Sequence, residues 1–153
     1  MITEIRSGDQ LLAIILPGEF DRPGLHFFTP RDFSQQLAYM RHPPGKVIPP
    51  HVHNPVPRSV LYTFEVLFVK RGKVRVDFFN DGQQYLESRV LKAGDVILLA
   101  TGGHGFEALE ELEMIEVKQG PYAGDKDKTR FDGVLPAQLK FGPEPKANST
   151  RGA

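Results

Sequence analysis

Short apolar stretches separated by turn residues run along most of the chain. In the clearest of them, residues 73–79, Val74, Val76 and Phe78 alternate with more polar neighbours. A period of two residues is typical of a β-strand with one buried face. By the same reasoning, we expect strands at residues 11–16, 25–29, 36–42, 61–70, 73–79, 85–91, 96–100, 105–109 and 112–118.

Glycine and proline punctuate these stretches. The 15 glycines and 13 prolines are spread between the predicted strands, and no segment has a helical repeat of about 12 residues or more. Pro49 and Pro50 keep residues 47–53 extended. The sequence Asn80-Asp81-Gly82 predicts a hairpin turn. We therefore expect an all-β sandwich or barrel in a single domain.

Length and composition narrow the class of protein. A chain of 153 residues with 40% hydrophobic and 25% charged residues suits one ordinary globular domain. Lys+Arg and Asp+Glu both number 19, and no basic stripe stands out, so we expect no nucleic-acid partner. We expect no membrane segment and a cytoplasmic location, because the apolar runs are short and the N-terminus lacks signal-peptide features. The absence of cysteine excludes disulfides and thiolate ligands.

Four side chains suggest a metal site. His51 and His53 are two residues apart on an extended segment, so their side chains project from the same face. Glu65 lies within an apolar predicted strand, where a metal cation would offset the cost of burying its charge. His104 follows Gly102 and Gly103. Three imidazoles and one carboxylate suit a single divalent transition metal such as Zn, Fe, Mn, Ni or Cu.

Each of these residues also has an ordinary interpretation. An isolated His-x-His pair is often exposed in a loop, a single glutamate often lies at a strand edge, and a histidine after two glycines is often structural. The occurrence of all four in this order, with glycines before and after them, favours a metal site that uses at least three of them.

This order of residues resembles the two motifs of the cupin family, carried here by Gly45, His51, His53, Glu65 and Gly72, and by Gly94, Ala100, Gly102 and His104. The resemblance implies a double-stranded β-helix, or jelly-roll barrel, over residues 1–119, with the motif core at about 45–109. It also implies that His51, His53, Glu65 and His104 bind the metal. The spacer 54–64 is longer than the family pattern and is predicted to form a loop near the metal. Residues 120–153 are expected to be a loop and a C-terminal tail.

The resemblance further implies a small metal-dependent enzyme that acts on a small polar metabolite, of dioxygenase, isomerase or lyase type. Two alternatives stay open: a non-catalytic module that binds or senses a carbohydrate or other small ligand, and a metal-independent sugar isomerase or epimerase. No catalytic residue is assigned. Tyr39 and Arg41 share one face of the 36–42 strand and are candidates for substrate binding, although a solvated sheet face is the better explanation of the two.

We also expect a homodimer. On the predicted 61–70 strand, the face opposite Glu65 carries Tyr62, Phe64, Val66 and Phe68. A face this apolar needs cover from another sheet, the N-terminal segment or a partner subunit. Packing of two such sheets across a dimer interface is the arrangement that we predict.

Overall fold

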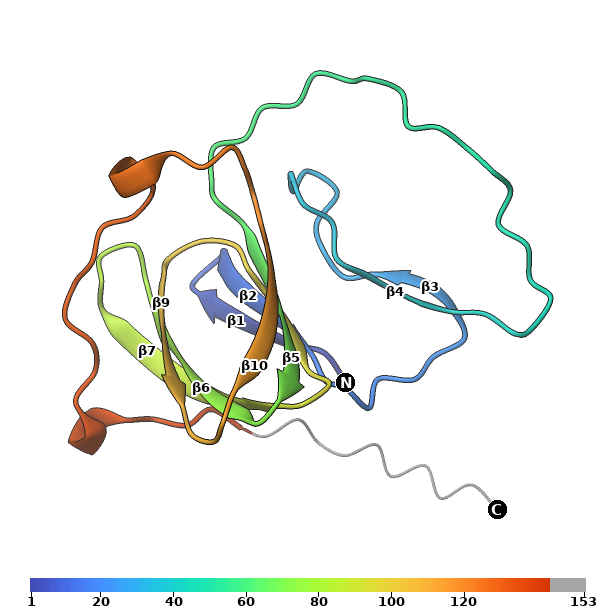
Figure 1. Cartoon of the computed structure of the whole chain (residues 1–153). Coiled ribbons are helices and arrows are strands. Elements are labelled where there is room, and N and C mark those ends of the chain that lie inside the picture. Colours follow the sequence, from blue (N-terminus) through green and yellow to red (C-terminus); the bar gives the residue numbers. More distant parts are fainter. Residues whose placement is uncertain (144–153) are drawn as a thin grey trace, which may run out of the picture. The chain divides into compact units, whose positions relative to one another are not determined.

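A computed structural model describes residues 1–143 and shows an all-β chain (Figure 1), which confirms the expected fold class. The strands are β1 (Thr3–Ser7), β2 (Gln10–Leu16), β3 (Gly24–Phe27), β4 (Ala38–Arg41), β5 (Glu65–Arg71), β6 (Lys73–Phe79), β7 (Tyr85–Lys92), β8 (Val96–Leu99), β9 (Gly103–Ala108) and β10 (Glu113–Lys118). Two short 3-10 helices follow, η1 (Gly124–Asp127) and η2 (Pro136–Gln138). Neither of these, nor any other helix within the described part of the chain, has the length and apolar character needed to cross a membrane.

The strands form antiparallel sheets that are compatible with a β-sandwich. One sheet has five strands in the order β1-β2-β8-β5-β10, and a second has three strands in the order β7-β6-β9. Both sheets contribute to a single hydrophobic core, made of Ile5, Leu12, Ala13, Ile15, Leu67, Val69, Val74, Val76, Phe78, Leu91, Ile97 and Leu99.

The chain divides into two compact units. The first comprises residues 1–20 together with the chain from Tyr62 onward, and it holds both of these sheets. The second comprises residues 21–61 and holds the two-stranded sheet of β3 and β4. Within the second unit, residues 47–53 are exposed and form no strand, so that this segment lacks the partner strand that would fix its register.

Most strands lie where the apolar pattern predicts them. Residues 73–79 form β6 as expected, and the turn at Asn80 joins β6 to β7. The predicted strand 61–70 begins only at Glu65. The pattern did not reveal β1, because Ile5 is its one buried apolar residue, at 2% exposure.

Candidate functional site

Glu65 is the first residue of β5, and its carboxylate faces the core side of the five-stranded sheet. It lies opposite Leu99 of β8 and opposite Lys118 of β10. Side chains alternate along a strand, so Glu65 shares its face with Leu67 and Val69, both of which belong to the core. The burial of a carboxylate on this face requires a polar or cationic partner.

His104 lies on β9 in the three-stranded sheet and also faces the core side. It is opposite Phe78 of β6, a core residue, and paired residues on neighbouring strands share a face. Gly102 precedes the strand with a φ of +71°, and a Cβ atom there would lie 2.4 Å from the carbonyl oxygen of Phe79. Only glycine can come this close to the Phe79 carbonyl group, so the position of Gly102 determines that β9 begins at the next residue, Gly103.

The Glu65 carboxylate and the His104 imidazole meet, although they come from different sheets. His104 Nε2 lies 3.2 Å from Glu65 Oε2, and the two side chains are 29% and 12% exposed. The hydrogen bond from His104 lowers the pKa of Glu65 below its usual value, and the charges of His104 and Lys118 add to this effect. Together these interactions outweigh the opposing effect of burial.

Two further charged residues extend the site. Lys118 Nζ lies 3.4 Å from Glu65 Oε1 and 2.7 Å from Asp127 Oδ2. The Thr63 hydroxyl donates to Asp127 Oδ1 at 3.2 Å. The hydrogen bond between Lys118 and Asp127 raises the pKa of Lys118 and lowers that of Asp127. The site is therefore a continuous polar cluster that runs from His104 through Glu65 and Lys118 to η1.

Sequence reasoning missed Lys118 and Asp127 as members of this cluster. The direction of the Lys118 side chain depends on the register of β10, which a local pattern does not record. This register shifts between Glu113 and Met114, and Lys118 lies opposite Glu65. Asp127 lies in a charged segment with no periodic pattern, so no signal in the sequence points to it.

The predicted ligands His51 and His53 lie in the second unit. Their rings are 5.2 Å apart at an interplanar angle of 76°, and both residues are exposed. His51 Nδ1 donates a hydrogen bond to the Pro49 carbonyl oxygen at 3.0 Å. Within residues 1–143, no three His, Asp or Glu side chains of either unit form a group that could hold a metal ion.

Tyr39 and Arg41, the predicted substrate-binding residues, also lie in the second unit, on β4. Tyr39 is opposite His26 of β3, and Arg41 is opposite Gly24. Arg41 Nη1 pairs with Asp21 Oδ1 at 2.7 Å, with both side chains more than half exposed. An exposed ion pair of this kind contributes little to stability. Their role in substrate binding stays a prediction.

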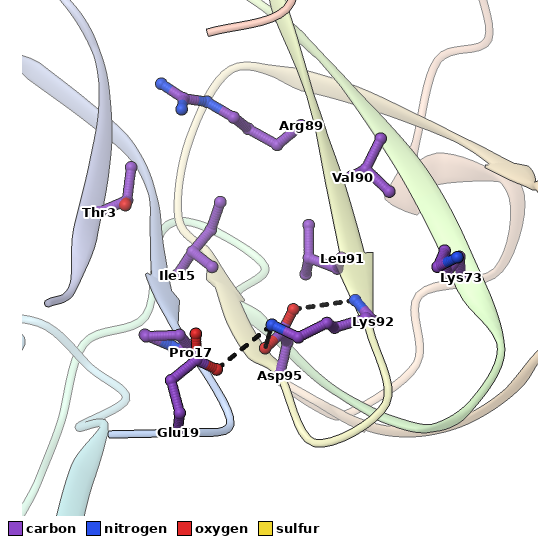
Figure 2. A pocket seen from close by; sticks show the side chains of 10 residues that line it. All are labelled: Thr3, Ile15, Pro17, Glu19, Lys73, Arg89, Val90, Leu91, Lys92 and Asp95. Atoms are coloured by element: carbon purple, nitrogen blue, oxygen red, sulfur yellow. Dashed lines mark hydrogen bonds and ion pairs between the residues drawn. The ribbon is translucent and has the colours of Figure 1, made fainter. Parts of the chain in front are cut away.

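A separate pocket of about 290 Å³ lies in the first unit, between β1–β2 and β7 (Figure 2). It is lined by Thr3, Ile15, Pro17, Glu19, Lys73, Arg89, Val90, Leu91, Lys92 and Asp95. Asp95 accepts hydrogen bonds from the backbone N–H groups of Gly18 and Lys92, both at 2.8 Å.

The other charged groups of this pocket are paired as well. Lys92 contacts Glu19 at 3.3 Å, Lys73 contacts Glu110 at 2.7 Å, and Arg89 contacts Glu87 at 2.8 Å. The charged groups around the pocket are therefore paired with one another, and the polar cluster at Glu65 is the stronger candidate for a functional site.

The apolar face opposite Glu65 is partly covered. Phe64 is 4% exposed, whereas Tyr62 and Phe68 are 49% and 40% exposed. On β10, Ile115 and Val117 lie opposite Phe68 and Val66 and are also about half exposed. A homodimer through this face stays a prediction.

Comparison with protein-family models, with curated proteins and with solved structures found no match to this chain. The case for a function therefore depends on the residues of the site and their geometry.

Proposed function

We propose that the chain is a metal-binding protein of the cupin type, a small enzyme that binds one divalent transition metal and acts on a small polar metabolite. The observation that carries this proposal is the 3.2 Å contact between the Glu65 carboxylate and the His104 imidazole, which two different sheets bring to the core side of the sandwich. These are two of the four side chains whose order along the chain resembles the cupin motifs.

The donor atoms at this site fit a transition metal. A carboxylate oxygen and an imidazole nitrogen are both common ligands of such ions. Glu65 and Asp127 bring two negative charges to the cluster, and Lys118 brings one positive charge. A divalent cation would offset this negative charge at a site that is largely withdrawn from water. His51 and His53 would complete a set of three imidazoles and one carboxylate.

The sheet arrangement supports a double-stranded β-helix as the specific fold. A five-stranded and a three-stranded antiparallel sheet share one core, and Glu65 and His104 project toward that core from facing sheets. Rigid strands make good supports for ligands, because a metal requires fixed distances and directions.

A bound metal would supply Lewis acidity toward a substrate oxygen at an open coordination position. The chain's own residues have distinct parts in this proposal. Lys118 contacts one oxygen of Glu65, which leaves the other oxygen directed at His104. Asp127 forms a second ion pair with the Lys118 ammonium, so that the position of Glu65 is set by two successive ion pairs.

Elemental analysis of the purified chain tests this proposal. We expect one metal ion per chain in the wild type and in a His26→Ala control, because His26 is not part of the ligand set. The variants Glu65→Gln, His104→Ala, His51→Ala and His53→Ala should each lose roughly 10-fold or more in metal affinity. Full metal content in both His51→Ala and His53→Ala would show that the ligand assignment is wrong.

A second candidate function has one observation in its favour. Lys118 already provides a cation next to Glu65, and a carboxylate paired with an imidazole can transfer protons without a metal. This arrangement suits the metal-independent isomerase or epimerase alternative. A folded preparation that neither contains nor takes up a divalent metal would favour this second function over the first.

A further inference from the structure

One edge of the three-stranded sheet pairs with a segment from near the end of the described chain. β7 is the edge strand of this sheet, so its backbone groups on the side facing away from β6 have no partner among the strands of the sheet. Residues 140–142 run along this edge and form a parallel bridge in which Phe141 lies opposite Ser88. The Ser88 N–H donates to the Lys140 carbonyl oxygen at 2.8 Å, and the Gly142 N–H donates to the Ser88 carbonyl oxygen at 3.2 Å.

A network of buried polar side chains lies behind the point where this segment pairs with β7. Arg75 donates twice to Asp77, at 2.8 and 3.0 Å, and Asp77 accepts the Ser88 hydroxyl at 2.5 Å. The Tyr85 hydroxyl contacts the Ser88 hydroxyl at 2.8 Å and accepts the Lys140 N–H at 2.8 Å. Ser88 is 0% exposed and Asp77 is 7% exposed. The Tyr85 hydroxyl therefore presents a hydrogen-bonding group to the main chain of the segment, and it is linked through Ser88 to the buried Asp77 and Arg75 on β6.

The site recognises main chain more than side chains. The Phe141 side chain is 60% exposed although its backbone is at the centre of the bridge. Arg89 donates to the carbonyl oxygen of Pro143, which is again a main-chain group. These features match strand addition, in which an extended peptide pairs with an open sheet edge. The ligand class for this edge is accordingly an extended peptide.

The segment is also separable from the rest of the fold. Phe131 packs edge-on against Phe79 with ring centroids 5.0 Å apart, and its ring would collide with a Cβ atom on Gly103. The chain is thus anchored at Phe131, before the segment begins. Release of residues 139–143 would leave this anchor and the two-sheet core in place.

We propose that the edge of β7 between Tyr85 and Arg89 binds residues 139–143 of a second copy of this chain, so that two copies exchange these segments. A second copy is the partner that we infer, because it offers the same main-chain groups with which the edge pairs within one chain. For this exchange, the segment has only to leave the β7 edge of its own chain and pair with the β7 edge of the other copy.

Complementary full-length variants test the exchange. Gly142→Pro removes the N–H that bonds to Ser88 and adds a Cβ atom that would lie 2.3 Å from the Arg89 guanidinium, so we expect its own segment to leave the edge. Tyr85→Phe weakens the edge and frees an intact segment. We expect a mixture of the two to associate at least roughly 10-fold more tightly than either variant alone, measured by sedimentation. Phe141→Pro is the matched control, because the Phe141 N–H takes no part in the bonds described above, and it should not leave the edge vacant.

Hydrogen exchange at the Ser88 amide reports independently whether the edge is vacant. We expect hydrogen exchange at the Ser88 amide to be faster in Gly142→Pro than in the wild type, and to slow again when Tyr85→Phe is added. The proposal is overturned if the mixture sediments as two monomers, or if the Ser88 amide stays protected in Gly142→Pro alone. A third result also overturns the swapping of segments between two copies. In this result, a synthetic 136–143 peptide binds to the vacant edge, but the two variant chains do not associate.

A measurement on the wild type needs no substitution and covers the case in which a variant fails to fold. The 136–143 peptide, added in excess, should displace the chain's own segment and speed exchange at the Gly142 amide. Unchanged exchange at this amide would overturn the proposal.

Discussion

Lys118 and Asp127 form an ion pair, with Lys118 Nζ 2.7 Å from Asp127 Oδ2, that ties the segment after β10 back to the end of that strand. The same ammonium contacts Glu65. The position of η1 is therefore linked to the carboxylate that we assign to the metal site, and a change at one should be detectable at the other.

Removal of the Lys118 charge should loosen η1. In Lys118→Gln, we expect hydrogen exchange at the amides of residues 124–127 to become several-fold faster, because Asp127 loses its ion pair and keeps only the Thr63 hydroxyl. Lys126→Gln is the control, since Lys126 is an exposed lysine of the same 3-10 helix. Equal exchange in both variants would contradict the role given to Lys118.

The interactions of Glu65 should make stability depend on acid pH. The pKa of Glu65 is lowered from 4.5 in the folded protein, so its contribution is fully present above pH 4.5 and is lost as the pH falls through the lower, folded value. We expect metal-free wild type to be more stable than Glu65→Gln by about 2 kcal/mol at neutral pH. This difference should disappear in strong acid.

Urea unfolding of both proteins across the acid range measures this effect. A difference that stays constant down to the lowest pH at which the chain folds would show that the Glu65 charge is not the source of the stabilisation.

Metal removal should lower the melting temperature of the wild type. A ligand at about 1,000 times its dissociation constant stabilises the folded state by about 4 kcal/mol, which corresponds to roughly 10 °C for a chain of this size. A chelator should therefore shift the calorimetric transition downward in the wild type. The same chelator should have little effect on Glu65→Gln, which lacks the carboxylate ligand. A wild-type transition that is insensitive to chelator would argue against a tightly bound metal.

The turn between β5 and β6 should not tolerate a side chain. Gly72 has a φ of +80°, and a Cβ atom there would lie 2.1 Å from the Glu111 carbonyl oxygen, which is backbone and cannot move aside easily. Gly72→Ala should cost about 3 kcal/mol of unfolding free energy, from backbone strain and collision together. Gly8→Ala is the control, because Gly8 has a φ of +58° but open space around it, and it should cost about 1 kcal/mol.

Equilibrium denaturation of both variants separates these two contributions. Equal losses of stability would mean that the approach of Glu111 to Gly72 has no energetic consequence.

Local sequence pattern predicted much of the fold but only part of the candidate site. Strand β6 alternates so regularly that its bounds follow from Val74, Val76 and Phe78 alone. Glu65 and His104 were recognisable because each interrupts or borders an apolar strand, where a polar side chain requires a reason. The contact between them depends on how two sheets pack, which no local pattern records.

The remaining features depend on long-range pairing. Lys118 faces Glu65 because of the register between β5 and β10, and Asp127 reaches Lys118 from a segment without periodicity. Ser88 belongs to no pattern in the sequence, yet it is fully buried and pairs with a segment more than 50 residues away. Such contacts appear only when distant parts of the chain are placed together.

The tight turn at Gly102 has a consequence for how the site could evolve. Neighbouring residues of a strand face opposite sides, so a shift of β9 by one position would replace the His104 imidazole on the core side with a glycine, either Gly103 or Gly105. Insertions or deletions near this turn would therefore abolish the imidazole contact in a single step.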